Sequence, residues 1–174
     1  MYFSLTFDYT PKEVPTKAVM RGFGIERRYR IADGPRKGQV IDAAHASQVV
    51  RAGDTVQVDL LIEAPEVRRY VAIDDPLPAG LEPMTLDFAT ARASAETLPE
   101  PDERWRIASG EWIFNHTEQR DDRVVLFSDR MPAGRHRYTY LARATTEGAF
   151  MAPAARVHEM YHPEVFAQTP ASAL

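Results

Sequence analysis

The 174-residue chain contains no cysteine. Disulfide bonds and thiolate metal sites are therefore excluded, and packing must hold the fold together. A chain of this length can bury a sizeable core without such cross-links. The missing cysteine does not identify the compartment, because oxidising compartments also hold cysteine-free domains.

A basic excess and long apolar runs are also missing. The 21 basic residues are outnumbered by 25 acidic ones and form no long run, so no nucleic-acid partner is expected. No apolar stretch is long enough to span a bilayer, so direct membrane insertion is not expected. No charged leader precedes Tyr2 and Phe3, and we therefore expect the chain to begin inside a longer protein.

Apolar residues recur with a period of two along much of the chain. In residues 55–63 every second side chain is apolar and is expected to face inward, while Gln57 and Asp59 are expected to face outward. This alternation is typical of a strand with one buried face. The same reasoning predicts strands at residues 3–9, 25–31, 69–74, 111–116, 123–128, 137–144, 149–151 and 155–161.

A short motif recurs where two of these strands end. Residues 75–80 read Asp-Pro-Leu-Pro-Ala-Gly, and residues 129–134 begin with Asp and end in Pro-Ala-Gly. Proline presets one backbone dihedral, and glycine supplies the positive φ of a tight reversal. We therefore expect residues 123–144 to form a hairpin.

Helical signals are few and weak. Residues 41–50 and 89–97 are short runs without a full amphipathic stripe. The sequence predicts an all-β fold, an antiparallel β-sandwich with at most one or two short helices. We expect a single sandwich domain over residues 1–167, with a loop insertion near 89–104 and a flexible tail over 168–174.

Residues 158–162 read His-Glu-Met-Tyr-His and match the zinc-protease pattern H-E-x-x-H. That chemistry needs a helix, so that His158 and His162 share one face and hold Zn²⁺ while Glu159 activates a water molecule. Pro163 follows directly, and a residue before proline is biased away from helix. We therefore expect no zinc site here. The alternative, a zinc protease, requires helix over residues 156–162.

Other catalytic or binding patterns are weaker. Asp74-Asp75 and Asp121-Asp122 have the chemistry of a Ca²⁺ loop, but such pairs more often hydrogen-bond nearby backbone amides in turns. No nucleophile elbow, phosphate loop or dinucleotide motif occurs. The sequence therefore predicts no catalytic residue, no metal and no cofactor, and a protein that docks onto other protein domains.

Segments over nearly the whole chain resemble the C-terminal end of bacterial alpha-2-macroglobulins, the large protease-trapping proteins of the periplasm. They follow the family's order and comprise residues 21–29, 52–58, 70–83, 121–124, 132–134, 138–146 and 153–166. The last of them is the most specific. The resemblance implies the final macroglobulin-like domain, a β-sandwich, of a larger secreted or lipid-anchored endopeptidase inhibitor in the cell envelope.

The resemblance also implies a mechanism. In that family a protease cuts a bait region, the parent rearranges, and an exposed Cys–Gln thioester captures the protease. Glu159, Met160, Tyr161 and Pro163 would dock on the thioester domain and shield the bond from water. Because this chain lacks cysteine, the thioester would lie elsewhere in the parent, and some family members have none. The partners would be the thioester domain and other macroglobulin domains of the parent, with target proteases engaged indirectly.

One further alternative stays open, a stand-alone β-sandwich interaction module of the cell envelope. A stand-alone module should bury Met160 and Tyr161 in its own core. An inhibitor domain should instead expose an apolar patch around both side chains.

Overall fold

The computed structural model describes residues 16–41, 50–84 and 113–174. The strands within these ranges are β1 (Val19–Arg21), β2 (Gly24–Ile31), β3 (Val40–Ile41), β4 (Thr55–Ala64), β5 (Arg68–Pro76), β6 (Leu81–Pro83), β7 (His116–Arg120), β8 (Arg123–Met131), β9 (Gly134–Ala144), β10 (Met151–Ala152), β11 (Arg156–Glu159), β12 (Phe166–Gln168) and β13 (Ser172–Ala173). A 3-10 turn, η1 (Gly34–Arg36), follows β2. The predicted strand at residues 3–9, most of the helical run at 41–50, the run at 89–97 and the loop near 89–104 lie outside the described residues.

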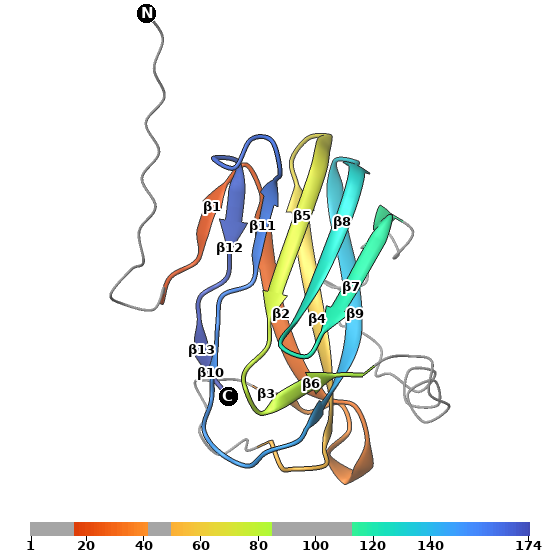
Figure 1. Cartoon of the computed structure of the whole chain (residues 1–174), viewed down its shortest axis with the longest axis vertical. Helices are drawn as coiled ribbons and strands as arrows, with labels where there is room; N and C mark the ends of the chain where they lie inside the picture. The colour runs from red at the N-terminus through yellow and green to blue at the C-terminus, as the bar shows by residue number, and fades with distance from the viewer. Residues whose placement is uncertain (1–15, 42–49, 85–112) are drawn as a thin grey trace, which may run out of the picture.

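Two antiparallel sheets pack face to face, as the sequence predicted. One has the order β1-β12-β11-β5-β8-β7, and the other β3-β2-β4-β9-β6. Figure 1 shows the six strands of the first sheet side by side, and β10 pairs with β13 in a small ribbon near the C-terminus. In the described ranges no helix has the length and apolar content to cross a membrane.

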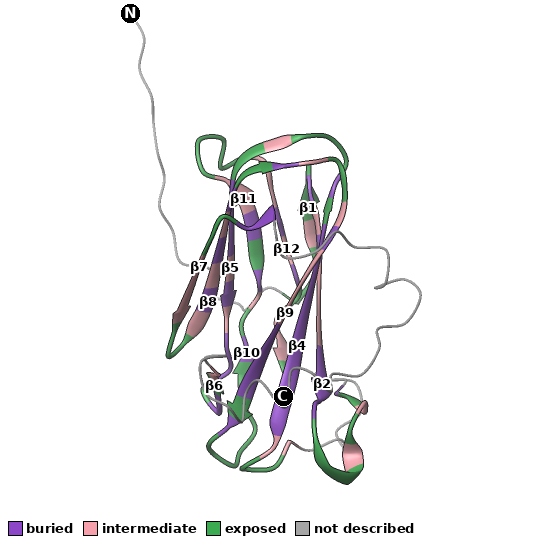
Figure 2. Cartoon of the chain, turned by 90° about the vertical axis from the view of Figure 1, so that its right-hand side faces the viewer, coloured by how far each residue is buried: buried purple, intermediate pink, exposed green. Residues whose placement is uncertain are grey.

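The core lies between the sheets and is built by the predicted alternation. On β4, Val56, Val58, Leu60 and Ile62 are completely buried. Inward residues of β5, β8 and β11 meet them from the other sheet, and Figure 2 shows exposed connections at both ends of the sandwich. Strands with one apolar face thus bury it against each other, as the period of two requires.

Residues 123–144 do not form the predicted hairpin. β8 pairs with β5 and β7 in the six-stranded sheet, whereas β9 pairs with β4 in the five-stranded sheet. The Pro-Ala-Gly link therefore carries the chain from one sheet to the other, and the related link from β5 to β6 does the same. The prediction was wrong because a turn motif fixes a local reversal but not the strand that each arm will pair with.

The glycines of the two links also differ. Gly134 has φ +130°, as the turn prediction requires. Gly80 does not have a positive φ; a Cβ atom there would lie 2.4 Å from Cε2 of Phe150. At Gly80 the missing side chain therefore serves a close approach, and the predicted positive φ was wrong at this position.

Several segment boundaries differ from the sequence prediction. The predicted strand at 155–161 is shorter in the structure, because β11 ends at Glu159 and residues 160 and 161 lie in the following loop. Residues 113–115 are not in a strand, and β7 begins only at His116. Ile113 and Phe114, which precede it, are buried against the core. Their apolar side chains fill the sandwich without joining a ladder, which alternation alone cannot distinguish from a strand. Residues 168–174 were predicted as a flexible tail; in the structure Gln168 ends β12, and Ser172–Ala173 pair with β10.

The outward face of β4 is buried as well. Asp59 is completely buried and accepts hydrogen bonds from Arg30 at 2.6 Å, Gln57 at 2.8 Å and Thr139 at 2.8 Å. Gln57 is also buried. The prediction that Gln57 and Asp59 face outward holds for the direction of the pleat, but both side chains form a polar layer closed to solvent.

Candidate docking surface

The predicted docking residues lie in the loop that joins β11 to β12. The Glu159 amide donates to the Val165 carbonyl at 3.1 Å, and the Val165 amide donates to the His162 carbonyl at 2.9 Å. A third bond runs from the Met160 amide to the Tyr70 carbonyl on β5 at 2.8 Å. The loop is therefore tied both to itself and to the neighbouring strand, and it lies at the end of the sandwich away from the C-terminus (Figure 1).

Large apolar side chains are exposed on this loop. Tyr161 is 71% exposed and Met160 is 48% exposed. Tyr70, also 48% exposed, meets Tyr161 edge to face, with ring centroids 5.2 Å apart and planes at 85°. We call Tyr70, Met160 and Tyr161 the docking surface. The exposure of Met160 and Tyr161 contradicts the stand-alone alternative, in which both fill the domain's own core.

Glu159 and Pro163 have different surroundings. Pro163 is exposed in the same loop. The Glu159 side chain is only 12% exposed, and its carboxylate lies 3.6 Å from Arg68 Nη1. Arg68 also donates to the Gly22 carbonyl at 3.0 Å, and its guanidinium lies over the Phe23 ring at 5.3 Å. Glu159 therefore braces the base of the loop and does not present a free carboxylate.

Tyr70 was not among the residues singled out from the sequence. Its contact with Tyr161 joins positions far apart in the chain, and no short motif carries it. One backbone feature marks it in the structure: φ is +52°, the only positive value for a non-glycine residue in the described part of the chain.

The H-E-x-x-H motif does not have the geometry of a zinc protease. His158 and Glu159 lie in β11, and His162 lies in the loop beyond it, so the histidines do not share a helix face. Burial lowers the pKa of His158, and Arg156 adds to this shift. The described residues include no group of three metal-ligating side chains placed to hold an ion. The zinc alternative required a helix, and the strand contradicts it.

The acidic pairs are used in ion pairs within the fold. Asp74 lies 3.1 Å from Arg123, and Asp122 contacts the same guanidinium at 3.1 Å. Asp75 is completely buried between the sheets, where it accepts from Arg27 Nη1 and from the Tyr140 hydroxyl, both at 2.6 Å. Asp75 is thus not available to a Ca²⁺ loop, and its role in joining the sheets was not foreseen.

Burial and charge oppose each other in this buried polar cluster, which comprises Arg27, Asp75 and Tyr140. Burial raises the pKa of Asp75, and the Arg27 guanidinium and Tyr140 hydroxyl partly offset that shift. Burial also opposes the charge on Arg27, but the Asp75 carboxylate outweighs it and raises the pKa of Arg27. Arg27 further donates to the Pro153 carbonyl at 2.6 Å. The cluster is therefore a satisfied structural ion pair.

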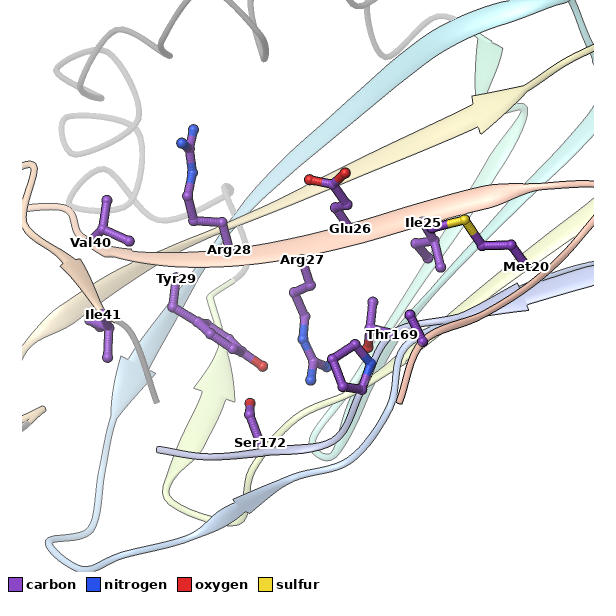
Figure 3. A pocket seen from close by; sticks show the side chains of 12 residues that line it. Met20, Ile25, Glu26, Arg27, Arg28, Tyr29, Val40, Ile41, Thr169 and Ser172 are labelled. Carbon is purple, nitrogen blue, oxygen red and sulfur yellow. The ribbon is translucent and has the colours of Figure 1, made fainter. Parts of the chain in front are cut away.

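A cleft of about 450 Å³ lies beside this cluster. Figure 3 shows Arg27 and Tyr29 pointing from β2 toward the segment that carries Thr169 and Ser172, while Arg28 points away from it. The Arg27 guanidinium is already committed to Asp75 and to two backbone carbonyls. The Arg27 guanidinium is therefore not available to hold a ligand in this cleft.

Comparison with known proteins places most of the sandwich in one family. Residues 22–164 match the family described as Bacterial Alpha-2-macroglobulin MG10 domain. The chain is 32% identical over 143 residues to the Escherichia coli alpha-2-macroglobulin, covering 80% of this chain and 8% of that protein. It is also 28% identical over 171 residues to the Dictyostelium discoideum Circularly permutated Ras protein 2, covering 97% of this chain and 4% of that protein.

A solved structure agrees. The native conformation of E. coli alpha-2-macroglobulin superposes with a TM-score of 0.73 at 27% identity, covering 95% of this chain and 10% of that one. The chain therefore spans a tenth or less of each of these relatives. The family match runs from the β1–β2 junction into the β11–β12 loop, so it includes Met160, Tyr161 and Pro163. The chain belongs to the bacterial alpha-2-macroglobulin MG10 domain family.

Proposed function

We propose that this chain is the C-terminal domain of a bacterial protease trap, and that it docks on the thioester domain of its parent and shields the thioester. Met160 and Tyr161 provide the cover, and Glu159 and Pro163 hold the segment that presents them. The observation that carries the proposal is the exposure of two large apolar side chains on a loop whose backbone is fixed.

The chemistry of the docking surface suits this task. A thioester survives only while water and amines are kept away from its carbonyl carbon. An aromatic ring beside a flexible thioether gives broad apolar cover that adapts to the partner's shape. The Tyr161 hydroxyl adds one polar group that can hydrogen-bond the partner. Because each side chain is already partly covered, completing its burial contributes about 1–2 kcal/mol, and the two together bias the parent toward the closed arrangement.

The rest of the proposed setting follows from the same role. The chain has no cysteine, so the reactive thiol belongs to another domain of the parent. The E. coli relative is about ten times as long as this chain, which leaves room for that domain. On this proposal the parent is a secreted or lipid-anchored protein of the periplasm. Its target proteases meet this domain only indirectly, through capture by the exposed thioester.

The test uses the full-length parent and measures how fast free thiol appears, with and without methylamine. Tyr161→Ala and Met160→Ala each remove one covering side chain. Met151→Ala is the matched control, because Met151 is 52% exposed but lies in β10 near the C-terminus. Losing about 1–2 kcal/mol of cover should speed thiol release roughly 5- to 30-fold in the first two variants, and Met151→Ala should leave it unchanged.

Two results would contradict the proposal. One is a thiol release rate that is the same in Tyr161→Ala, Met160→Ala and the unaltered parent. The other is a parent gene without a Cys-x-x-Gln segment upstream of the sandwich, since the loop would then have no thioester to cover.

A further inference from the structure

Tyr70 has a backbone conformation that its own strand does not require. Its φ of +52° lies in the left-handed region, where a bulky aromatic side chain is strained. The ladder on either side is regular, since Arg69 pairs with Arg130 and Val71 pairs with Ser128 in one continuous register. The strain therefore does not compensate for a slip or an inserted residue.

Burial does not explain the strain either. The Tyr70 side chain remains 48% exposed, so the unusual φ does not bring the ring into the core. What the conformation does provide is contact with the β11–β12 loop. The Tyr70 carbonyl accepts from the Met160 amide at 2.8 Å, and its ring lies edge to face with the Tyr161 ring at 5.2 Å.

These two contacts act on the two residues that cover the thioester in the proposed function. The carbonyl fixes the backbone at Met160, and the ring limits the rotation of the exposed Tyr161 side chain. A side chain that is already held in its bound orientation loses less entropy on docking. Strained residues persist where the surroundings over-determine them, and they gather at functional surfaces.

We propose that Tyr70 is a positioning residue of the docking surface, which holds Tyr161 in the orientation that the thioester domain of the parent receives. The partner that docks on this surface is a domain of the same parent, because this chain accounts for only a tenth of its solved relative. This inference rests on the proposed function, and the two are tested separately below.

The first experiment uses the 174-residue chain and does not depend on a thioester. Tyr70→Gly removes the ring but accepts the positive φ, so the unfolding midpoint should fall by no more than about 4 °C. The NMR signals of the Tyr161 ring should shift and sharpen as the ring becomes free to rotate. Tyr138, which meets Phe114 edge to face at 5.4 Å, is the internal control and should not change. Unaltered Tyr161 signals would overturn the positioning role.

The second experiment measures thiol release in the full-length parent. Tyr70→Gly should speed release roughly 2- to 10-fold, the range expected for loss of one aromatic edge contact. Tyr70→Phe keeps the ring and should retain the slow rate. Tyr70→Gly combined with Tyr161→Ala should be no faster than Tyr161→Ala alone, because Tyr70 acts through Tyr161.

The outcomes separate the two proposals. If Tyr161→Ala speeds release and Tyr70→Gly does not, Tyr70 has no positioning role and the shielding proposal stands. If the double variant multiplies the two effects, Tyr70 contacts the partner independently and the inference is wrong. If neither single variant speeds release, shielding itself fails and the inference fails with it.

Discussion

Replacing Asp75 with asparagine tests how the two sheets are joined. Asp75 lies on β5 of the six-stranded sheet, while Arg27 on β2 and Tyr140 on β9 belong to the five-stranded sheet. The carboxylate is completely buried, and both partners reach it at 2.6 Å. Asparagine keeps the shape and can still accept from Tyr140, but it leaves the Arg27 guanidinium buried without its counter-charge.

The structure sets the size of the effect. Removing one partner of a buried ion pair costs about 3–5 kcal/mol, because an uncompensated charge stays out of water. Arg27→Met should cost a similar amount, since it leaves the Asp75 carboxylate with only the Tyr140 hydroxyl as donor. The double variant removes both charges, and a buried pair replaced as a whole is often close to neutral. Its stability should therefore exceed that of either single variant.

The assay is equilibrium urea unfolding of four proteins: the 174-residue chain, its Asp75→Asn and Arg27→Met variants, and the double variant. The dependence of the unfolding free energy on urea should be equal in all four, so that only the midpoint moves. The coupling energy should be at least about 2 kcal/mol. If the loss in the double variant equals the sum of the two single losses, Arg27 and Asp75 do not act as a pair, and this account of sheet joining is wrong.

Three further changes have defined outcomes. Asp59→Ala should lower the unfolding free energy by about 3–5 kcal/mol because it strips a buried ion pair, and a loss below about 1 kcal/mol in urea would contradict the buried polar layer. Burial and Arg156 lower the pKa of His158 in the folded chain, so its contribution to stability is present above the unfolded pKa of about 6.5 and is lost as pH falls through the folded value. His158→Gln should therefore lessen the fall in unfolding midpoint below pH 6.5. If the unfolding midpoint depends on pH in the same way in both proteins, the predicted loss of stability at low pH is wrong. Gly80→Ala places a Cβ 2.4 Å from Phe150 and should cost about 1–3 kcal/mol, which Phe150→Leu in the same chain should largely restore.

The sequence predicted the strands better than it predicted their partners. The alternation along β2 and β4 is a local property, because each pleat directs successive side chains to opposite faces. Pairing is not local: β9 joins β4 over Thr55–Ala64, although β8 precedes β9 by a short turn. Both arms of a turn can satisfy the same alternation in one sheet or in two, and only the whole sandwich decides between them.

Polar residues show the same limit. Asp59 and Asp75 look like surface or turn residues in the sequence, and both are completely buried in the structure. A carboxylate can be buried only where a cation and hydroxyl or amide donors converge on it. Apart from Gln57, the donors to Asp59 and Asp75 come from strands distant in the chain. The loop containing Met160 and Tyr161 was found from the sequence, whereas Tyr70 was not, because its contribution depends on a left-handed φ and on the pairing of β5 with β11.

The docking surface is separate from the interactions that hold the sandwich together, and this separation suits a reversible closure. The loop follows β11, which pairs with β5 on one side and β12 on the other, so the strand that supports the loop is rigid. Its exposed side chains add little to folding, and their substitution should change stability by no more than about 0.5 kcal/mol. Completing the burial of Met160 and Tyr161 in a partner contributes about 2–4 kcal/mol in all, from which immobilising the two side chains subtracts about 1–3 kcal/mol. A contact of this size keeps a closed state populated, yet it can be broken when cleavage elsewhere in the parent changes the arrangement of its domains.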